Sequence, residues 1–229
     1  MSYRPITDVW ILARPKVKFY GAYPAGFLKR GRDLLGVRPH DPVLHVCAGA
    51  IRQYPGPHAG VLYEGLGPND FTLDASPEHE PDFLRDATFD LPPLHVRRGT
   101  PIEDQTTSTM DERDSIFMRS SDWGATTNLH AVDNGLWPAI LIDRPYTEAD
   151  HKRYAASATV KLPALNALLK QALRRVPLGG RVGVLDYKWP RPPLTGPIIG
   201  REVATIPVLT GRDNQARVYT VFERRPAKE

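Results

Sequence analysis

The sequence contains a single cysteine, Cys47, among 229 residues, so an intrachain disulfide framework is excluded. It has no apolar run of about 18 residues, which argues against a membrane-spanning helix, and its first residues lack the apolar core of a signal peptide. Its seven histidines show no spacing typical of metal ligands. These absences predict a cytoplasmic protein that needs neither metal nor disulfide to fold around its own core.

Neither sign of charge is in large excess. The net charge is +4 and the isoelectric point is about 9.2, with 22 arginines against 8 lysines. Arginine pairs well with phosphate, which is compatible with a nucleic-acid substrate. A charge of this size spread over the whole chain is equally compatible with a protein that binds no nucleic acid.

The clearest pattern that is present is a series of short apolar or β-branched runs, each ended by glycine, aspartate or proline. Runs of about four to eight such residues are typical of strands that are buried on both faces of a parallel sheet. Seven runs have this character, at residues 43–49, 71–74, 87–89, 139–143, 181–187, 203–209 and 216–222. The turn-rich residues 210–215 between the last two predict a hairpin.

Helical spacing separates some of these runs. Residues 24–35 carry apolar side chains at helical intervals and are followed by Gly36, which is typical of a helix end. Residues 146–176 show a longer stripe of period 3.6, which Pro163 divides into two helices. Alternating strands and helices predict an α/β fold, with an open, mostly parallel seven-stranded Rossmann-like sheet and a terminal antiparallel hairpin.

Two segments interrupt this alternation. Residues 50–69 are rich in glycine and proline, which disfavours a long helix after the first strand. Residues 92–136 are polar, and loops of this length are uncommon unless they are functional or mobile. We therefore expect a single domain over residues 1–229, with residues 92–136 as an insert that serves as a target-recognition element or a mobile loop.

Candidate binding residues follow the first two strands, because ligands of open α/β sheets bind beyond the carboxyl ends of the strands. The first strand ends in Cys47, Ala48 and Gly49, whose small side chains let the backbone approach a ligand closely. Asp74 ends the second strand, and an acid there accepts both hydrogens of a ribose diol. Asp74 also suits the N-cap of a following helix, and Cys47 also suits a small buried core position.

Two further groups lie beside the third and fourth strands. Asp86 and Ala87 precede or open the third strand, where a side chain would meet an adenine amino group, although Asp86 also suits an ordinary surface acid. The fourth strand ends in a tetrapeptide of Asp143, Arg144, Pro145 and Tyr146. Asp143 alone would also suit the cap of the next helix.

These motifs, in this order, resemble the class I, Rossmann-like methyltransferases that use S-adenosylmethionine. More narrowly, they resemble the amino-group methylases of DNA, whose fourth strand ends in Asp, Asn or Ser, then two prolines and an aromatic residue. Residues 19–28 resemble the motif that these enzymes place before the glycine-containing strand, and residues 178–184 resemble their step into strand five. The resemblance covers roughly residues 17–91 and 137–223. This chain departs from the pattern in having Arg144 where the family has proline.

The resemblance implies a role for each of these residues. The Asp143 carboxylate and the Arg144 carbonyl would accept hydrogen bonds from an exocyclic amine, while Pro145 shapes the turn and Tyr146 stacks on the flipped base. The resemblance implies S-adenosylmethionine as the cofactor and no metal, since the sulfonium is already an activated leaving group. The implied cofactor contacts come from Tyr23, Pro24, Cys47, Ala48, Gly49, Asp74, Asp86 and Ala87.

The resemblance thus implies methylation of an exocyclic amino group of a base, first of all adenine N6 in DNA. The expected partner is nucleic acid, DNA in preference to RNA. One alternative is a class I methyltransferase that acts on a small molecule, RNA or protein, which the replacement of a motif proline by Arg144 would fit. The second alternative is a non-catalytic Rossmann-like module that binds nucleic acid or a protein partner.

Overall fold

The computed structural model describes residues 4–13, 23–49, 51, 66–67, 69–94, 135–145, 148–154, 161–210 and 216–227. Most of the glycine-rich segment at 50–69 lies outside these residues. So do nearly all of the expected insert at 92–136 and the side chain of Tyr146.

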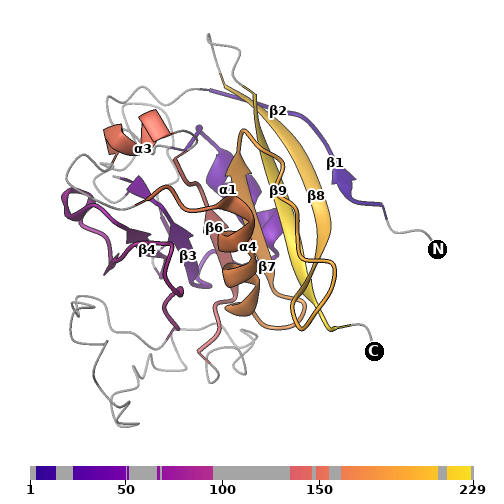
Figure 1. Ribbon diagram of the computed structural model, residues 1–229. Helices are drawn as coiled ribbons and strands as arrows, with labels where there is room; N and C mark the ends of the chain where they lie inside the picture. Colours follow the sequence, from indigo (N-terminus) through magenta and orange to yellow (C-terminus); the bar gives the residue numbers. More distant parts are fainter. Residues whose placement is uncertain are drawn as a thin grey trace, which may run out of the picture.

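One sheet of nine strands forms the centre of the molecule (Figure 1). The strands are β1 (Ile6–Thr7), β2 (Trp10–Leu12), β3 (Val43–Val46), β4 (Phe71–Asp74), β5 (Phe83–Leu84), β6 (Ala139–Ile142), β7 (Arg181–Asp186), β8 (Ile199–Thr210) and β9 (Ala216–Arg225).

The sheet has the order β1-β8-β9-β7-β6-β3-β4-β5, and β2 also pairs with β8. All pairs are parallel except the two made by β9, which runs antiparallel to β7 and to β8. An open, mostly parallel α/β sheet with a terminal antiparallel hairpin is therefore confirmed. The predicted count of seven strands was wrong, because β1 and β2 add two strands beside β8.

The predicted third strand at residues 87–89 was also wrong. The strand lies earlier, at β5, and residues 87–89 form a turn. The Asp86 side chain accepts a hydrogen bond from the Thr88 N–H at 2.8 Å, and the Asp86 carbonyl accepts one from the Phe89 N–H at 3.1 Å. These local bonds compete with strand pairing. Asp86 consequently follows the third strand instead of preceding it.

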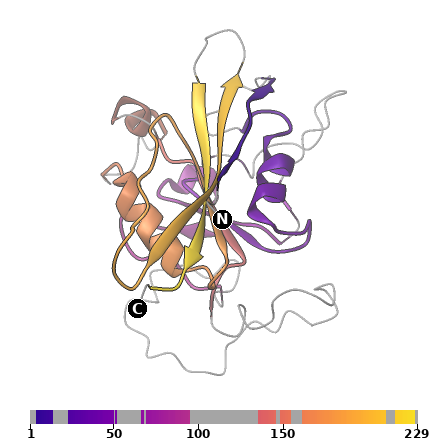
Figure 2. The same ribbon diagram turned by 90° about the vertical axis from the view of Figure 1, so that its right-hand side faces the viewer.

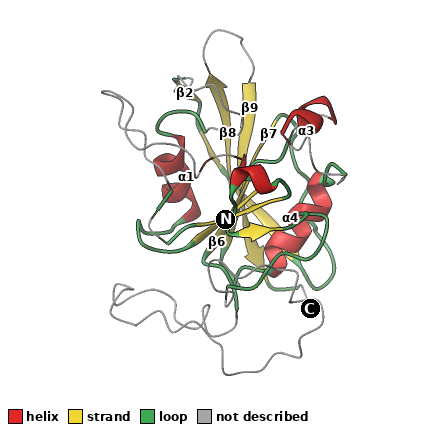
Figure 3. Ribbon diagram, turned by 90° about the vertical axis from the view of Figure 1, so that its left-hand side faces the viewer, coloured by secondary structure: helices red, strands yellow, loops and turns green. Residues whose placement is uncertain are grey.

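Helices cover both faces of the sheet. Helix α1 (Phe27–Leu35) ends at Gly36 in a left-handed conformation, φ 70°, as predicted. The stripe after residue 146 forms α3 (Glu148–Tyr154) and α4 (Leu165–Arg174), with Pro163 between them, and a 3₁₀ turn spans Pro77–His79. With the hairpin of β8 and β9 facing the viewer, α1 lies on one side of the sheet and α4 on the other (Figure 2), and the opposite view shows the same arrangement (Figure 3). Within the described residues, no helix combines the length and apolarity needed to cross a membrane.

Each face of the sheet has its own hydrophobic core. The cluster under α4 includes Leu168, Leu173 and Trp137, packed on alternate strand residues such as Val46 and Val184. The cluster under α1 includes Phe27 and Leu35 with Tyr219 of β9. Strand residues alternate between the clusters, as the twofold period of a strand requires.

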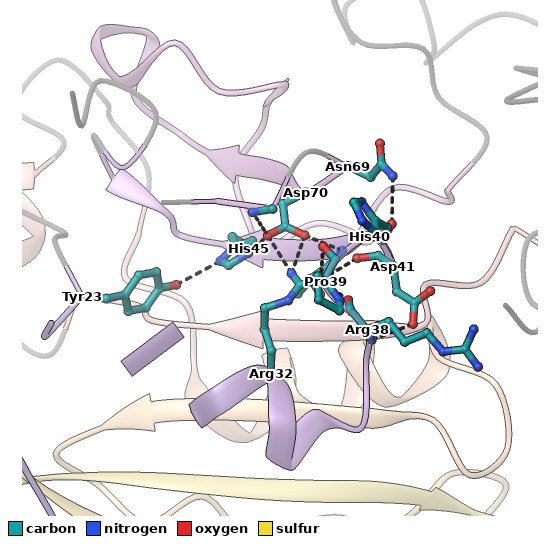
Figure 4. Close-up of polar contacts among 11 residues, drawn as sticks. Tyr23, Arg32, Arg38, Pro39, His40, Asp41, His45, Asn69 and Asp70 are labelled. Carbon is teal, nitrogen blue, oxygen red and sulfur yellow. Dashed lines mark hydrogen bonds and ion pairs between the residues drawn. The ribbon is translucent and has the colours of Figure 1, made fainter. Parts of the chain in front are cut away.

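A buried polar cluster supports the amino-terminal ends of β3 and β4 (Figure 4). Both carboxylate oxygens of Asp70 accept hydrogen bonds from Arg32 Nη1, at 2.7 Å to Oδ1 and 2.8 Å to Oδ2. The Oδ2 atom also lies 3.2 Å from His45 Nε2. The carboxylate also accepts the backbone N–H groups of Val43 and Gly67, at 3.1 and 2.7 Å. Burial alone would raise the pKa of Asp70, but His45 and Arg32 outweigh it and lower this pKa to about 2.

We expect the stability of the fold to depend on Asp70 at acid pH. Its pKa in the folded chain is below the ordinary value of 3.8, so its stabilisation is fully present above about pH 4 and is lost as the pH falls towards 2. A shift of this size corresponds to roughly 2 kcal/mol. Urea unfolding from pH 7 to pH 3 measures it. Asp70→Asn should be less stable at pH 7 and should lack this loss of stability at acid pH. The exposed control Asp33→Asn should show the same loss as the parent.

Candidate functional site

The strand order changes direction between β3 and β6. Strands β4 and β5 lie in succession on one side of β3, and strands β6 and β7 lie in succession on its other side. The crevice beyond the carboxyl ends at such a switch is where open α/β sheets bind ligands. Residues 47–49 directly follow β3, and residues 143–145 directly follow β6, while Asp74 is the last residue of β4 and Asp86 lies two residues after β5. The structure therefore brings these residues to one edge of the sheet.

The turn after β3 has an unusual backbone. Cys47 has φ 58° and Gly49 has φ 59°, and non-glycine residues rarely adopt such a left-handed conformation. The Leu73 carbonyl of β4 accepts hydrogen bonds from the N–H groups of Cys47 and Ala48, at 2.8 and 3.3 Å. Ala48 is buried and Cys47 is partly buried. The turn is thereby held against the end of β4 with only small side chains in it.

Asp74 joins that turn to the segment after β4. Its Oδ2 accepts the Gly49 N–H at 2.9 Å, and its Oδ1 accepts the Ser76 N–H at 2.9 Å and lies 3.1 Å from His79 Nδ1. The carboxylate is 9% exposed. Asp74 therefore orders the edge of the site through backbone donors, and the Gly49 N–H is directed at Asp74.

Two ion pairs connect the residues that follow β6 to neighbouring strands. Arg217 of β9 lies 3.8 Å from the Asp143 carboxylate, measured from Nη1 to Oδ2. Arg144 forms an ion pair with Asp186 at the end of β7, 2.9 Å from Nε to Oδ2. Both members of this second pair are buried. The arginine at position 144 is therefore paired with Asp186.

The electrostatics of the site are centred on Cys47. Burial raises the pKa of its thiol, and the carboxylates of Asp74, Asp143 and Asp86 raise it further, while Arg144 opposes them. Carboxylates from three strand ends are thus grouped around Cys47, with Arg144 as a nearby opposing charge. Carboxylates that a ligand can reach attract a positively charged group.

Two predicted cofactor contacts lie in the core instead. Tyr23 is 1% exposed, stacks on Phe27 with ring centroids 5.3 Å apart, and its hydroxyl lies 3.4 Å from His45 Nδ1. Pro24 is buried beside it, and its carbonyl accepts the Phe27 N–H at 3.0 Å. The structure gives the Tyr23 side chain a packing role. Ala87 is also buried, in the turn after β5.

Sequence reasoning missed three residues that shape this edge: Asp186, Arg217 and His79. Asp186 had a usable signal, since it is an acid at the carboxyl end of a strand, like Asp74. Arg217 and His79 carry no such signal, because their places depend on the pairing of β9 and on the 3₁₀ turn. Among the described residues, no group of three or more His, Cys, Asp or Glu side chains is placed to hold a metal ion.

Comparisons with known proteins give distant structural likenesses. No model of a protein family and no curated protein sequence matches the chain. TrmN from Thermus thermophilus is 16% identical, with 90% of this chain and 50% of that chain covered and a TM-score of 0.43. The sugar N-methyltransferase KedS8 from Streptoalloteichus sp ATCC 53650 is 13% identical, with 90% and 73% covered and a TM-score of 0.32. This chain spans half the length of the TrmN chain, and likenesses at this level show no shared activity.

Proposed function

We propose that the chain is an S-adenosylmethionine-dependent methyltransferase that methylates an exocyclic amino group of a base, first of all adenine N6 in DNA. One observation carries the proposal. Asp74, Asp86 and Asp143 lie at or just after the ends of three strands around the switch point of the sheet, near enough to Cys47 for each to raise the pKa of its thiol, and Asp143 belongs to the segment that resembles the amino-methylase tetrapeptide.

The residues at this edge fit the proposed methyl donor. S-adenosylmethionine, when bound, supplies a methyl group on a positively charged sulfonium. The three carboxylates would attract that charge, and the turn of residues 47–49 presents small side chains beside them. Asp74 retains acceptor capacity for a ribose, because each carboxylate oxygen has two lone pairs and Oδ2 accepts a hydrogen bond from the Gly49 N–H.

We propose that Asp143 and its neighbours bind the amine that accepts the methyl group. An exocyclic amine is a poor nucleophile, because its lone pair is delocalised into the ring. A carboxylate and a carbonyl that accept both amine hydrogens localise this pair, which is a matter of positioning and electrostatics. We assign these roles to the Asp143 side chain and the Arg144 carbonyl. Arg217, 3.8 Å from this carboxylate, is its ion-pair partner on β9.

A methyl-transfer assay with radiolabelled donor tests the proposal directly. DNA, RNA of the same sequence, and free nucleosides are offered as acceptors in parallel. Label in DNA that appears as N6-methyladenine supports the full proposal. Label that appears only in RNA or in a nucleoside would support the methyltransferase activity and would show that DNA is not the substrate. An absence of donor binding in calorimetry would overturn the enzyme altogether and favour a non-catalytic module.

We expect Asp74→Asn to weaken donor binding at least tenfold, because charge-assisted hydrogen bonds are worth about 1.5–3 kcal/mol each. Titration calorimetry with S-adenosylmethionine and with S-adenosylhomocysteine measures this loss. The two ligands share the ribose and differ in the sulfonium charge, so a ribose contact predicts the same loss for both.

Asp90→Asn is the matched control, since Asp90 is an exposed aspartate in the segment that follows β5. It should leave both dissociation constants unchanged. An unchanged affinity of a folded Asp74→Asn variant, judged by thermal unfolding, would remove Asp74 from the donor site.

A further inference from the structure

We infer that the loop after β7, residues 187–191, binds a single-stranded stretch of nucleic acid next to the candidate site. We call it the aromatic-basic loop, after its sequence Tyr187-Lys188-Trp189-Pro190-Arg191. The inference deepens the proposed function, on which it rests for the position of the reacting base.

The loop exposes aromatic and basic side chains in alternation. Tyr187 is 40% exposed and Trp189 is 57% exposed, so both aromatic side chains are accessible to a binding partner. Lys188 and Arg191 are exposed as well. Aromatic rings interleaved with cations are the combination that single-stranded nucleic acid requires, with bases stacked on the rings and phosphates near the cations.

The Trp189 ring is held in place although it is exposed. Its Nε1–H donates a hydrogen bond to Glu202 Oε2 at 3.1 Å, and the other oxygen of Glu202 accepts the Thr205 hydroxyl at 2.6 Å. Both partners belong to β8, the longest strand of the sheet. A ring that is fixed before binding loses little conformational freedom when a base stacks on it.

Asp186 links this loop to the candidate catalytic segment. Its Oδ1 accepts the Lys188 N–H at 2.9 Å, and its Oδ2 pairs with Arg144. Because Ile142 is paired with Val184 across β6 and β7, Asp143 and Arg144 follow β6 beside Leu185 and Asp186, the last two residues of β7. A strand of nucleic acid that crosses the aromatic-basic loop therefore passes beside Asp143.

The loop continues from the site towards the start of α4. The Arg191 N–H donates to the Asn166 side chain at 2.9 Å, at the first turn of that helix. The exposed rings and cations thus follow one another from the strand end to the helix. This arrangement favours an extended polyanion with stackable bases over a free nucleoside, which would occupy the site alone.

Fluorescence anisotropy with labelled oligo(dT) and oligo(rU) of equal length tests the inference. Trp189→Leu removes the ring face and keeps apolar bulk, and we expect at least about a fivefold loss of affinity, the effect of one stacked base. Trp189→Phe keeps a ring and should retain most of the affinity. Leu194→Ala is the matched control, an apolar residue of the same connection that is 72% exposed, and it should bind as the parent does.

Salt dependence gives the second readout. Lys188→Gln should lower the slope of log affinity against log salt by about one unit for a phosphate contact. Lys170→Gln, an exposed lysine on α4, should leave the slope unchanged. A similar Trp189 effect on both oligonucleotides indicates recognition of bases and phosphates alone, and a larger effect on one identifies DNA or RNA as the partner.

The inference and the proposed function fail in different ways. If nucleic acid is methylated but Trp189→Leu and Lys188→Gln bind both oligonucleotides as the parent does, the inference is wrong and the function stands. If no acceptor is methylated and yet oligonucleotide binding depends on Trp189, the loop is a nucleic-acid surface and the proposed enzyme is wrong.

Discussion

Replacing Asp143 by alanine is expected to lower kcat by about 10²–10⁴-fold while leaving donor affinity within about twofold. A positioned side chain that handles the proton of the reacting group contributes a factor of this size. The carboxylate is proposed to act on the acceptor amine, and its effect is greatest in the transition state, so the loss falls on turnover. Single-turnover methyl transfer, together with donor titration, measures the two quantities separately.

Asp143→Asn refines this experiment, since it keeps the shape of the side chain and removes its charge. It should retain part of the activity that alanine loses, because one oxygen still accepts a hydrogen bond. Asp33→Ala, at an exposed position on α1, should behave as the parent. Full turnover by Asp143→Ala would contradict the amino-methylase mechanism and favour a methyltransferase that acts on another kind of acceptor.

Most of the sheet was predictable because its strands are local apolar runs. Residues 43–46, 139–142 and 181–186 are such runs, and their burial on both faces leaves little room for another interpretation. Strands β1 and β2 were missed because they are two and three residues long. Their stability comes from pairing with β8, as in the pair of Ile6 with Ala204, and no local pattern reports a partner so distant in sequence.

The candidate site was predictable to the extent that it follows from strand ends. Asp74 and Asp143 lie where the rule for open α/β sheets places them. Tyr23 is buried, with its ring packed against Phe27 four residues later, and no local pattern predicts the orientation of that ring. The partner of Arg144 was missed for a related reason, since pairing between β6 and β7 decides which side chain the guanidinium meets.

Arg144→Met is expected to destabilise the fold by about 3–5 kcal/mol, because it leaves the Asp186 carboxylate buried without its ion-pair partner. Arg144→Pro, which would restore the tetrapeptide of the resembling family, should suffer the same loss. No such loss is expected if Arg144 is only a tolerated replacement of the motif proline. Urea unfolding at pH 7 measures the effect, and Arg191→Met, at an exposed arginine after β7, is the control.

Two measurements, the pH dependence of stability and a double variant, test whether the buried Asp186 carboxylate causes the destabilisation of Arg144→Met. Burial raises the pKa of Asp186, while the Lys188 N–H and Arg144 oppose this rise, so removal of Arg144 should raise the pKa further. A group whose pKa is higher in the folded chain favours folding at low pH and loses that contribution as the pH rises. The deficit of Arg144→Met should therefore shrink between pH 7 and pH 5. Adding Asp186→Asn should recover part of the loss at pH 7, and a strictly additive double variant would show that the two side chains do not interact.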